Sequence, residues 1–106
     1  MPVAVDPRSE FAQAVYQIMA AIPPGKVASY GAIACQAGFP RHARFVGRLM
    51  GTLPRGSTLP WWRVIRSDGR SGMTGAAAER QLSRLAAEGI VILGGRVDMR
   101  RYRAFD

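Results

Sequence analysis

The sequence has one cysteine, one histidine and one lysine among its 106 residues. Cys35 has no second cysteine with which to form an internal disulfide. Cys35 and His42 are together too few to build a zinc-type site, and no motif in the sequence requires a cofactor. No apolar run approaches the roughly 18 residues that a membrane span needs, and the first residues lack the pattern of a signal peptide. These absences favour a cytoplasmic location.

Acidic residues are nearly missing from the middle of the chain. Between Lys26 and Met73 there are eight basic residues and one acid, Asp68, whereas the other 58 residues carry seven bases and six acids. Fourteen of the 15 basic residues are arginines, whose planar guanidinium groups suit phosphate binding and base stacking. Such a stripe indicates a polyanion-binding surface; the alternative is a solvated face that only improves solubility. The central bases are Lys26, Arg41, Arg44, Arg48, Arg55, Arg63, Arg66 and Arg70.

Length and composition predict a single domain over residues 1–106, because 48% hydrophobic residues supply one modest core. Asp6-Pro7 is typical of a helix N-cap followed by proline at the first helical position. Apolar residues then recur at helical spacing, and Pro23-Pro24-Gly25 ends the predicted helix. The apolar positions are Phe11, Val15, Ile18, Met19 and Ile22.

Two shorter helices are predicted next. Ser29 is suited to cap a helix over about residues 30–36, Gly38 breaks that helix, and Pro40 can open a third. Two short helices separated by a glycine-containing turn are the pattern of a helix-turn-helix. The apolar positions of the third helix are Ala43, Val46, Leu49 and Met50.

The third helix is predicted to be basic on one face. Arg41, Arg44 and Arg48 are spaced i, i+3 and i+7 and therefore share a side of the helix. This makes it a candidate recognition helix, and a solvated surface helix is the alternative. His42 is expected to be exposed beside these arginines, as a surface or phosphate-contact residue.

The segment Trp61-Trp62-Arg63-Val64-Ile65 follows a Pro-rich loop over residues 52–60 and reads as a strand or buried loop. In a strand the two tryptophans point to opposite faces. The simplest interpretation places both in the core, although aromatic residues among arginines also suit base stacking.

The last third of the chain predicts one helix and a strand pair. The helix is expected over about residues 76–88 and ends at Gly89; it buries Leu82, Leu85 and Ala86. Apolar stretches at 90–93 and 96–99 flank Gly94-Gly95, which suggests a terminal strand pair or loop. The predicted fold class is mainly α with minor β.

The sequence offers little for catalysis. No general acid and base are evident, because the acids are few and scattered. Cys35 lies within a predicted helix beside alanines and Ile33, where we expect a small core residue. A reactive thiol needs an open, electropositive site, which its sequence neighbours do not supply.

Several segments resemble the alkylguanine-DNA alkyltransferases, in order and at consistent spacing from about residue 11 to 93. Residues 22–34 are similar to the entry of their helix-turn-helix, and residues 38–47 to the helix that carries their arginine finger. The run from Pro60 to Ile65 falls on their Pro-Cys-His-Arg-Val motif, and Glu88-Gly89 falls on the Glu-Gly that closes their last conserved helix. The resemblance implies the winged helix-turn-helix-like fold of their C-terminal DNA-binding domain.

The departures from that family concern its chemistry. Trp61 stands at the position of the nucleophilic cysteine, Trp62 at that of the activating histidine, and Leu53 at that of the asparagine that arranges the site. Alkyl transfer needs a thiolate activated by a neighbouring base. Tryptophan in place of the cysteine is similar to the alkyltransferase-like proteins, which bind alkylated guanine and do not repair it.

The resemblance also implies roles for individual residues. Arg44 is the finger that takes the place of the flipped base, and Tyr30 presses on the 3′ phosphate. Short side chains at Ala43 and Gly47 let the helix enter the narrow minor groove, and Arg63 is expected to pair with Glu88. The full set of implied DNA contacts is Ser29, Tyr30, Arg41, Ala43, Arg44, Gly47, Arg48 and Ser67. The implied lesion pocket comprises Met50, Trp61, Val64, Met73, Thr74 and Gly75.

The leading hypothesis is a non-enzymatic sensor that flips O6-alkylguanine out of duplex DNA and marks it for nucleotide excision repair. Its implied partners are alkylated double-stranded DNA and excision-repair proteins, and we expect a monomer associated with a bacterial nucleoid. One alternative is an active alkyltransferase that uses Cys35. Others are a helix-turn-helix transcription regulator that reads the major groove and a nonspecific basic DNA binder.

The basic stripe leads to a prediction about salt. If the stripe contacts phosphates, the affinity for duplex DNA should fall with ionic strength, with a logarithmic slope of roughly −0.9 per phosphate contacted. Fluorescence anisotropy of a labelled duplex over a series of salt concentrations measures this slope. A flat response would contradict the nucleic-acid interpretation.

Overall fold

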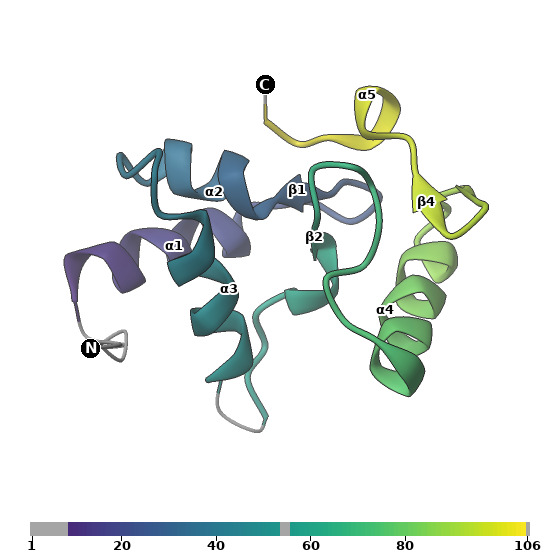
Figure 1. Ribbon diagram of the computed structural model, residues 1–106, viewed down its shortest axis with the longest axis horizontal. Coiled ribbons are helices and arrows are strands. Elements are labelled where there is room, and N and C mark those ends of the chain that lie inside the picture. Colours follow the sequence, from purple (N-terminus) through teal and green to yellow (C-terminus); the bar gives the residue numbers. More distant parts are fainter. Residues whose placement is uncertain (1–8, 54–55, 106) are drawn as a thin grey trace.

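The computed structural model describes residues 9–53 and 56–105 (Figure 1). It is mainly helical with minor β, as predicted, and the β strands form two small sheets. In the described residues, no helix has the length and apolar character needed to cross a bilayer. In chain order the elements are α1 (Glu10–Ala20), β1 (Ala28–Ser29), α2 (Tyr30–Gln36), α3 (Ala43–Gly51), a short 3-10 helix (Trp61–Arg63), β2 (Val64–Ile65), α4 (Gly75–Ala87), β3 (Ile92–Leu93), β4 (Arg96–Val97) and α5 (Met99–Tyr102).

Helix α1 begins later than the sequence pattern suggested. Its N-cap is Ser9, whose hydroxyl accepts a hydrogen bond from the Ala12 N–H at 3.1 Å. Asp6 and Pro7, which we expected to start the helix, lie outside the described residues. The predicted amphipathic pattern is confirmed, since Val15 and Met19 are fully buried on one face of α1.

Helix α3 also begins later than expected, at Ala43 rather than Pro40. The Phe39 N–H bonds to the Ala34 carbonyl and closes the end of α2, and the His42 N–H bonds back to the Phe39 carbonyl. Pro40 and Arg41 are therefore used in the turn between the helices. Arg41 lies before α3 and does not share a helical face with Arg44 and Arg48, so that prediction was wrong.

Two residues in this region lie differently from our expectation. Cys35 is exposed rather than buried, because α2 turns the neighbouring Ile33 and Ala34 into the core. His42 packs within a ring cluster and is not a freely exposed residue: its ring lies 5.1–5.5 Å from the rings of Phe11, Phe39 and Phe45. His42 is the N-cap residue of α3, but its side chain makes no capping hydrogen bond.

A short parallel ribbon of β1 and β2 separates two hydrophobic clusters. Ala28 pairs with Val64 and Ser29 with Ile65, and successive residues of a strand point to opposite faces. Ala28 and Val64 therefore join the cluster of α1, α2 and α3, whereas Ile65 joins the cluster of α4, the β3–β4 hairpin and α5. The sequence did not predict this ribbon.

Helix α4 buries a polar residue that the sequence reading missed. Gln81 is fully buried beside Leu85, while Ala86 is exposed, contrary to our expectation. The Gln81 side chain donates hydrogen bonds to the carbonyls of Val64 at 2.7 Å and Trp62 at 3.3 Å, and Ser71 donates to its amide oxygen. A buried amide is stable when both its groups are paired. Gln81 thus ties α4 to β2.

The predicted strand pair at the C-terminal end is confirmed, as a shorter hairpin. β3 and β4 are antiparallel, and Gly94 and Gly95 both have positive φ angles, of 59° and 74°. Two such residues form the tight turn that suits the twist of a hairpin. The second strand ends early, because Asp98 accepts a hydrogen bond from the Arg100 N–H and starts α5.

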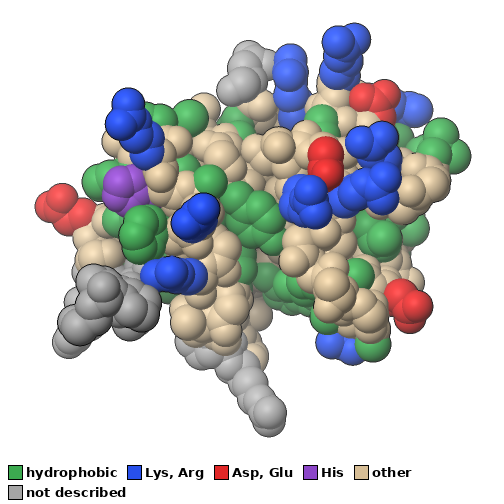
Figure 2. Space-filling view, viewed as in Figure 1, with side chains coloured by type: hydrophobic (Ala, Val, Ile, Leu, Met, Phe, Trp, Pro, Cys, Tyr) green, Lys and Arg blue, Asp and Glu red, His purple; other side chains and the backbone are tan. Residues whose placement is uncertain are grey.

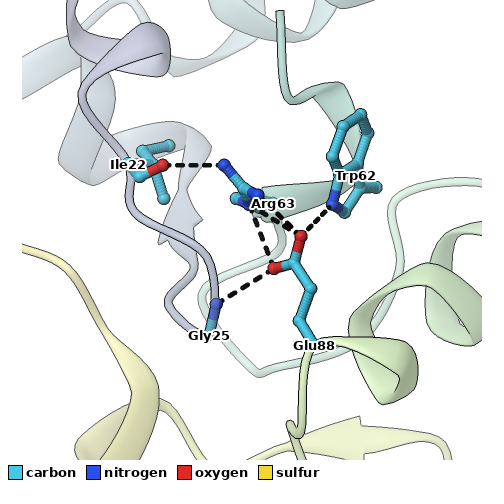
Figure 3. A network of polar contacts seen from close by, with 5 residues as sticks. All are labelled: Ile22, Gly25, Trp62, Arg63 and Glu88. Carbon is cyan, nitrogen blue, oxygen red and sulfur yellow. Dashed lines mark hydrogen bonds and ion pairs between the residues drawn. The ribbon is translucent and has the colours of Figure 1, made fainter.

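The expected pair between Arg63 and Glu88 is confirmed and belongs to a larger network (Figure 3). The Arg63 guanidinium lies 2.7 Å from Glu88 Oε2 and also donates to the Ile22 carbonyl. Glu88 accepts further hydrogen bonds from the Gly25 N–H at 3.0 Å and the Trp62 indole N–H at 2.8 Å. Burial by itself would raise the pKa of Glu88, but these hydrogen bonds and the charge of Arg63 outweigh it and lower the pKa to about 2.

Glu88→Gln should destabilise the fold by about 2–3 kcal/mol, because charge-assisted hydrogen bonds lose one ionic partner. A folded-state pKa below the ordinary value of 4.5 means that the carboxylate stabilises the protein fully above pH about 4.5, and that this stability is lost as the pH falls toward about 2. Urea unfolding from pH 7 to pH 2 should therefore show a shallower acid loss for Glu88→Gln than for the wild type. Glu79→Gln, on the exposed side of α4, is the matched control. Equal acid sensitivity of the wild type and Glu88→Gln would contradict the assignment.

Candidate nucleic-acid interface

The interface is built on α2 and α3, the helix pair predicted as a helix-turn-helix. Ser29 caps α2 by accepting a hydrogen bond from the Ala32 N–H at 3.0 Å, so its side chain holds the start of the helix. Gly38, with a φ of 88°, supplies the left-handed residue of the turn. Tyr30 is the first residue of α2 and faces α3.

A shallow surface depression brings four predicted DNA contacts together. Tyr30, Ala43, Arg44 and Gly47 line it, with Arg66 and Gly72 from the segment after β2, and its volume is about 420 Å³. Partial burial raises the pKa of the Tyr30 hydroxyl, so it remains a neutral hydrogen-bond donor near pH 7. The sequence reading missed Arg66 and Gly72 here, because they reach the depression only through the β1–β2 pairing.

Two glycines shape this depression in different ways. A Cβ at Gly72 would lie 2.5 Å from the Tyr30 hydroxyl oxygen, so a larger residue there would displace the tyrosine ring from its present position. A Cβ at Gly47 would meet nothing within 4 Å. Internal packing therefore does not require the small residue at Gly47, which leaves the surface of α3 low for an approaching ligand.

Basic side chains surround the depression. Figure 2 shows Lys and Arg side chains over this face, from α3 across to α5, with few acidic side chains between them. Arg41 and Arg44 are exposed, and the guanidinium of Arg48 lies 5.5 Å from the centre of the Phe45 ring. The predicted contacts Ser29 and Ser67 lie apart from the depression, in a small cleft with Arg103.

A cavity of about 380 Å³ lies beside the depression, against Trp61. Its lining includes three residues of the predicted lesion pocket, Met50, Trp61 and Met73. Gly47 and Met50 are one helical turn apart on α3, and Gly72 and Met73 are consecutive, so the depression and the cavity are neighbours along these two segments. The described lining is Met50, Leu53, Gly56, Ser57, Trp61, Met73, Ala77 and Arg80.

Three residues expected in the pocket do not line this cavity. Val64 points into the core with 1% of its surface exposed, because β2 turns it toward the α1–α3 cluster. Thr74 and Gly75 form the start of α4 and are exposed. Ala77 and Arg80 on α4 line the cavity in their place. Their spacing of three residues within a predicted helix was the sequence signal that could have identified them as neighbours on one face.

The rings of the two tryptophans contact each other edge to face and do not point to opposite faces of a strand. Because Trp61–Arg63 is a 3-10 helix rather than a strand, the indole rings of Trp61 and Trp62 meet edge to face at 6.0 Å. The guanidinium of Arg84 lies over both rings, 5.7 Å from Trp61 and 4.7 Å from Trp62. Trp61 thereby forms the wall of the cavity, and Trp62 connects that wall to Glu88.

The described lining of the cavity contains no thiol, imidazole or carboxylate. Cys35 lies on α2 and is absent from that lining. Within residues 9–53 and 56–105, no group of three His, Cys, Asp or Glu side chains is arranged to hold a metal ion. The arrangement is therefore that of an aromatic and apolar binding pocket beside a basic helix.

Comparison with known proteins agrees with this geometry. Residues 10–90 match the family described as the DNA-binding domain of 6-O-methylguanine DNA methyltransferase. The DNA base-flipping protein of Escherichia coli K12 is 47% identical over 100 residues, covering 93% of this chain and 78% of that protein. Alkyltransferase-like protein 1 of Schizosaccharomyces pombe is 42% identical over 85 residues, covering 78% and 79% of the two chains.

The fold agrees as well. The crystal structure of S. pombe Atl1 in complex with damaged DNA containing O6-carboxymethylguanine superposes with a TM-score of 0.83 at 36% identity, covering 92% of this chain and 96% of that one. The winged helix-turn-helix-like fold expected from the sequence is confirmed by this match. The chain therefore belongs to the family of the 6-O-methylguanine DNA methyltransferase DNA-binding domain and, within it, to the alkyltransferase-like proteins.

Proposed function

We propose that this protein is a non-enzymatic sensor of alkylated guanine in duplex DNA. It binds through the minor groove, turns the damaged nucleotide out of the duplex into the cavity beside Trp61, and marks the lesion for nucleotide excision repair. The observation that carries the proposal is that the Tyr30–Arg44 depression and the Trp61 cavity are neighbours along α3 and along residues 72–73. The depression contacts the phosphate backbone and the base stack, and the neighbouring cavity accepts the extruded base.

Each part of this surface has a role in the proposal. Arg44, exposed on α3, enters the duplex and fills the place of the extruded base. Tyr30 presses on the neighbouring phosphate, where its hydroxyl remains protonated. Gly47 and Ala43 keep α3 low enough for the narrow minor groove. A damaged pair costs less to open than a normal one, which contributes to selectivity.

The absence of alkyl transfer is part of the proposal. The cavity wall presents an indole at position 61, and transfer of an alkyl group needs an activated thiolate at that place. The only cysteine, Cys35, is exposed on α2. We further propose that the protein acts as a monomer in the cytoplasm, bound to the nucleoid, and that excision-repair proteins recognise its complex with damaged DNA.

The main test of the proposal compares matched duplexes with and without an alkyl group on the guanine O6 atom. Tighter binding to the alkylated duplex supports the sensor, whereas preference for a base sequence with no effect of the lesion supports a transcription regulator. Mass spectrometry after incubation decides the enzymatic alternative, because an added alkyl mass on the protein would show transfer.

Arg44→Ala should lower the affinity for alkylated duplex about tenfold, the size of one lost stacking contact of about 1–3 kcal/mol. It should reduce the affinity for undamaged duplex less, because the gap in the stack arises only after flipping. Arg48→Ala, one turn along α3, is the matched control and should weaken both duplexes alike. Fluorescence of 2-aminopurine opposite the lesion reports flipping in the same titrations. Equal effects of the two substitutions on the ratio of affinities would make Arg44 an ordinary phosphate contact.

Trp61→Cys should not restore alkyl transfer. A thiol with an ordinary pKa of about 8.5 is mostly protonated at neutral pH, and the neighbouring position holds Trp62, whose indole is engaged with Glu88. The nucleophile and its base act as a unit, so restoring the cysteine without the base recovers little activity. Lesion binding should weaken by about 1–3 kcal/mol through loss of the aromatic wall.

The substitution is best made together with Cys35→Ser, so that any added mass belongs to residue 61. Mass spectrometry after exposure to alkylated duplex and a titration with the same duplex give the two readouts. Stoichiometric alkylation would overturn the argument about lost chemistry. Unchanged affinity would show that Trp61 does not contact the flipped base.

A further inference from the structure

We propose that the cavity beside Trp61 contains an anion-binding subsite at Arg80, which makes the protein prefer O6-alkyl groups that end in a carboxylate over neutral groups of the same size. The inference rests on the proposed function, since it concerns which lesions the same cavity selects. It is carried by the placement of Arg80 in the described part of the lining, where the other residues are uncharged.

Arg80 reaches the cavity from α4. Ala77 and Arg80 are one helical turn apart, so they lie on the same side of the helix, and both line the cavity opposite Met50 on α3. Long side chains on a helix lean toward its N-terminus, which directs the Arg80 side chain over Ala77. The volume of about 380 Å³ falls within the range of small-molecule pockets and exceeds what a methyl group would use.

The other described residues of the lining carry no charge. Methionine, leucine, tryptophan, alanine, glycine and serine supply the other walls. Among the described residues no carboxylate pairs with Arg80, and Glu79, its neighbour in sequence, points to a different side of α4. Arg84, the next residue on that face, lies over Trp61 and adds positive potential behind the wall.

This combination selects by charge rather than by size. Arg80 is an exposed residue, so water screens part of its charge, but the apolar walls on the cavity side reduce this screening for an anion that enters the cavity. A guanidinium also donates two parallel hydrogen bonds to a carboxylate. A neutral group of equal volume makes the same contacts with Met50 and Trp61 but leaves the guanidinium without an anionic partner.

The competing role for Arg80 is a contact with a DNA phosphate. A phosphate contact would contribute equally to every duplex, whatever the guanine carries. The two roles therefore differ in the ratio of affinities between lesions and not in the affinity for any one of them.

The experiment uses the full chain and three duplexes of one sequence, which carry guanine, O6-carboxymethylguanine or its neutral amide, O6-carbamoylmethylguanine. The carboxymethyl adduct occurs in the DNA of the S. pombe Atl1 complex, so the probe is suited to this fold. The wild type should bind the carboxymethyl duplex about three- to tenfold more tightly than the amide duplex, as expected for a partly exposed, charge-assisted contact. Arg80→Gln should reduce this ratio to about one, and Arg80→Lys should retain part of it.

Arg100→Gln is the matched control, because it removes an equal charge from α5, outside the lining of this cavity, and should leave the ratio unchanged. A wild-type ratio of one, or a ratio that Arg80→Gln does not alter, overturns the subsite. Equal weakening of all three duplexes by Arg80→Gln assigns the residue to a phosphate instead. Failure of both adducts to bind more tightly than guanine would refute the proposed function itself. Preference for both adducts with no difference between them would refute only the subsite.

Discussion

The carboxylate of Glu88 holds together three segments that are distant in sequence. It accepts hydrogen bonds from the turn at Gly25, from the Trp62 indole and from the Arg63 guanidinium, which reaches on to the Ile22 carbonyl. A partly buried carboxylate is costly unless it is paired, and here three groups donate hydrogen bonds to it. The turn at Gly25 leads into the helix-turn-helix, Trp62 adjoins the cavity wall, and Glu88 itself follows α4. This side chain therefore helps to fix the position of the helix pair relative to the cavity.

The hydrogen bond to Glu88 also explains how a tryptophan is accommodated at position 62, where the resemblance to the alkyltransferases implies a histidine. Its indole N–H donates its single hydrogen bond to Glu88, and the guanidinium groups of Arg63 and Arg84 lie over its ring, at 5.2 and 4.7 Å. Cations over an indole face are stabilising. Trp62 is thus a supporting residue, which leaves Trp61 to form the surface that a base would meet.

The binding surface straddles the two hydrophobic clusters. The basic helix α3 packs on the first cluster through Val46 and Leu49, whereas α4 packs on the second through Leu85. The β1–β2 ribbon and the buried amide of Gln81 connect the two. A cavity at such a junction can be lined from both sides, and its lining includes Met50 of α3 and Arg80 of α4.

The sequence by itself determined the four longer helices, the helix-turn-helix, the glycine turn near the C-terminal end, the basic character of the surface and the loss of the cysteine at position 61, but it did not predict the 3-10 helix or α5. These follow from local rules: periodicity, capping, turn residues and the identity of side chains at motif positions. The predictions of a buried Cys35 and an exposed His42 were wrong, because the side of a short helix that is buried depends on what packs against it. Only the tertiary structure decided that Val64 is core, that Arg80 lines the cavity and that Gln81 is buried, because each depends on contacts with residues distant in the sequence. Val64 is placed by the pairing of β1 with β2, which joins residues 28–29 to residues 64–65, and contacts over such distances leave no periodic trace in the sequence.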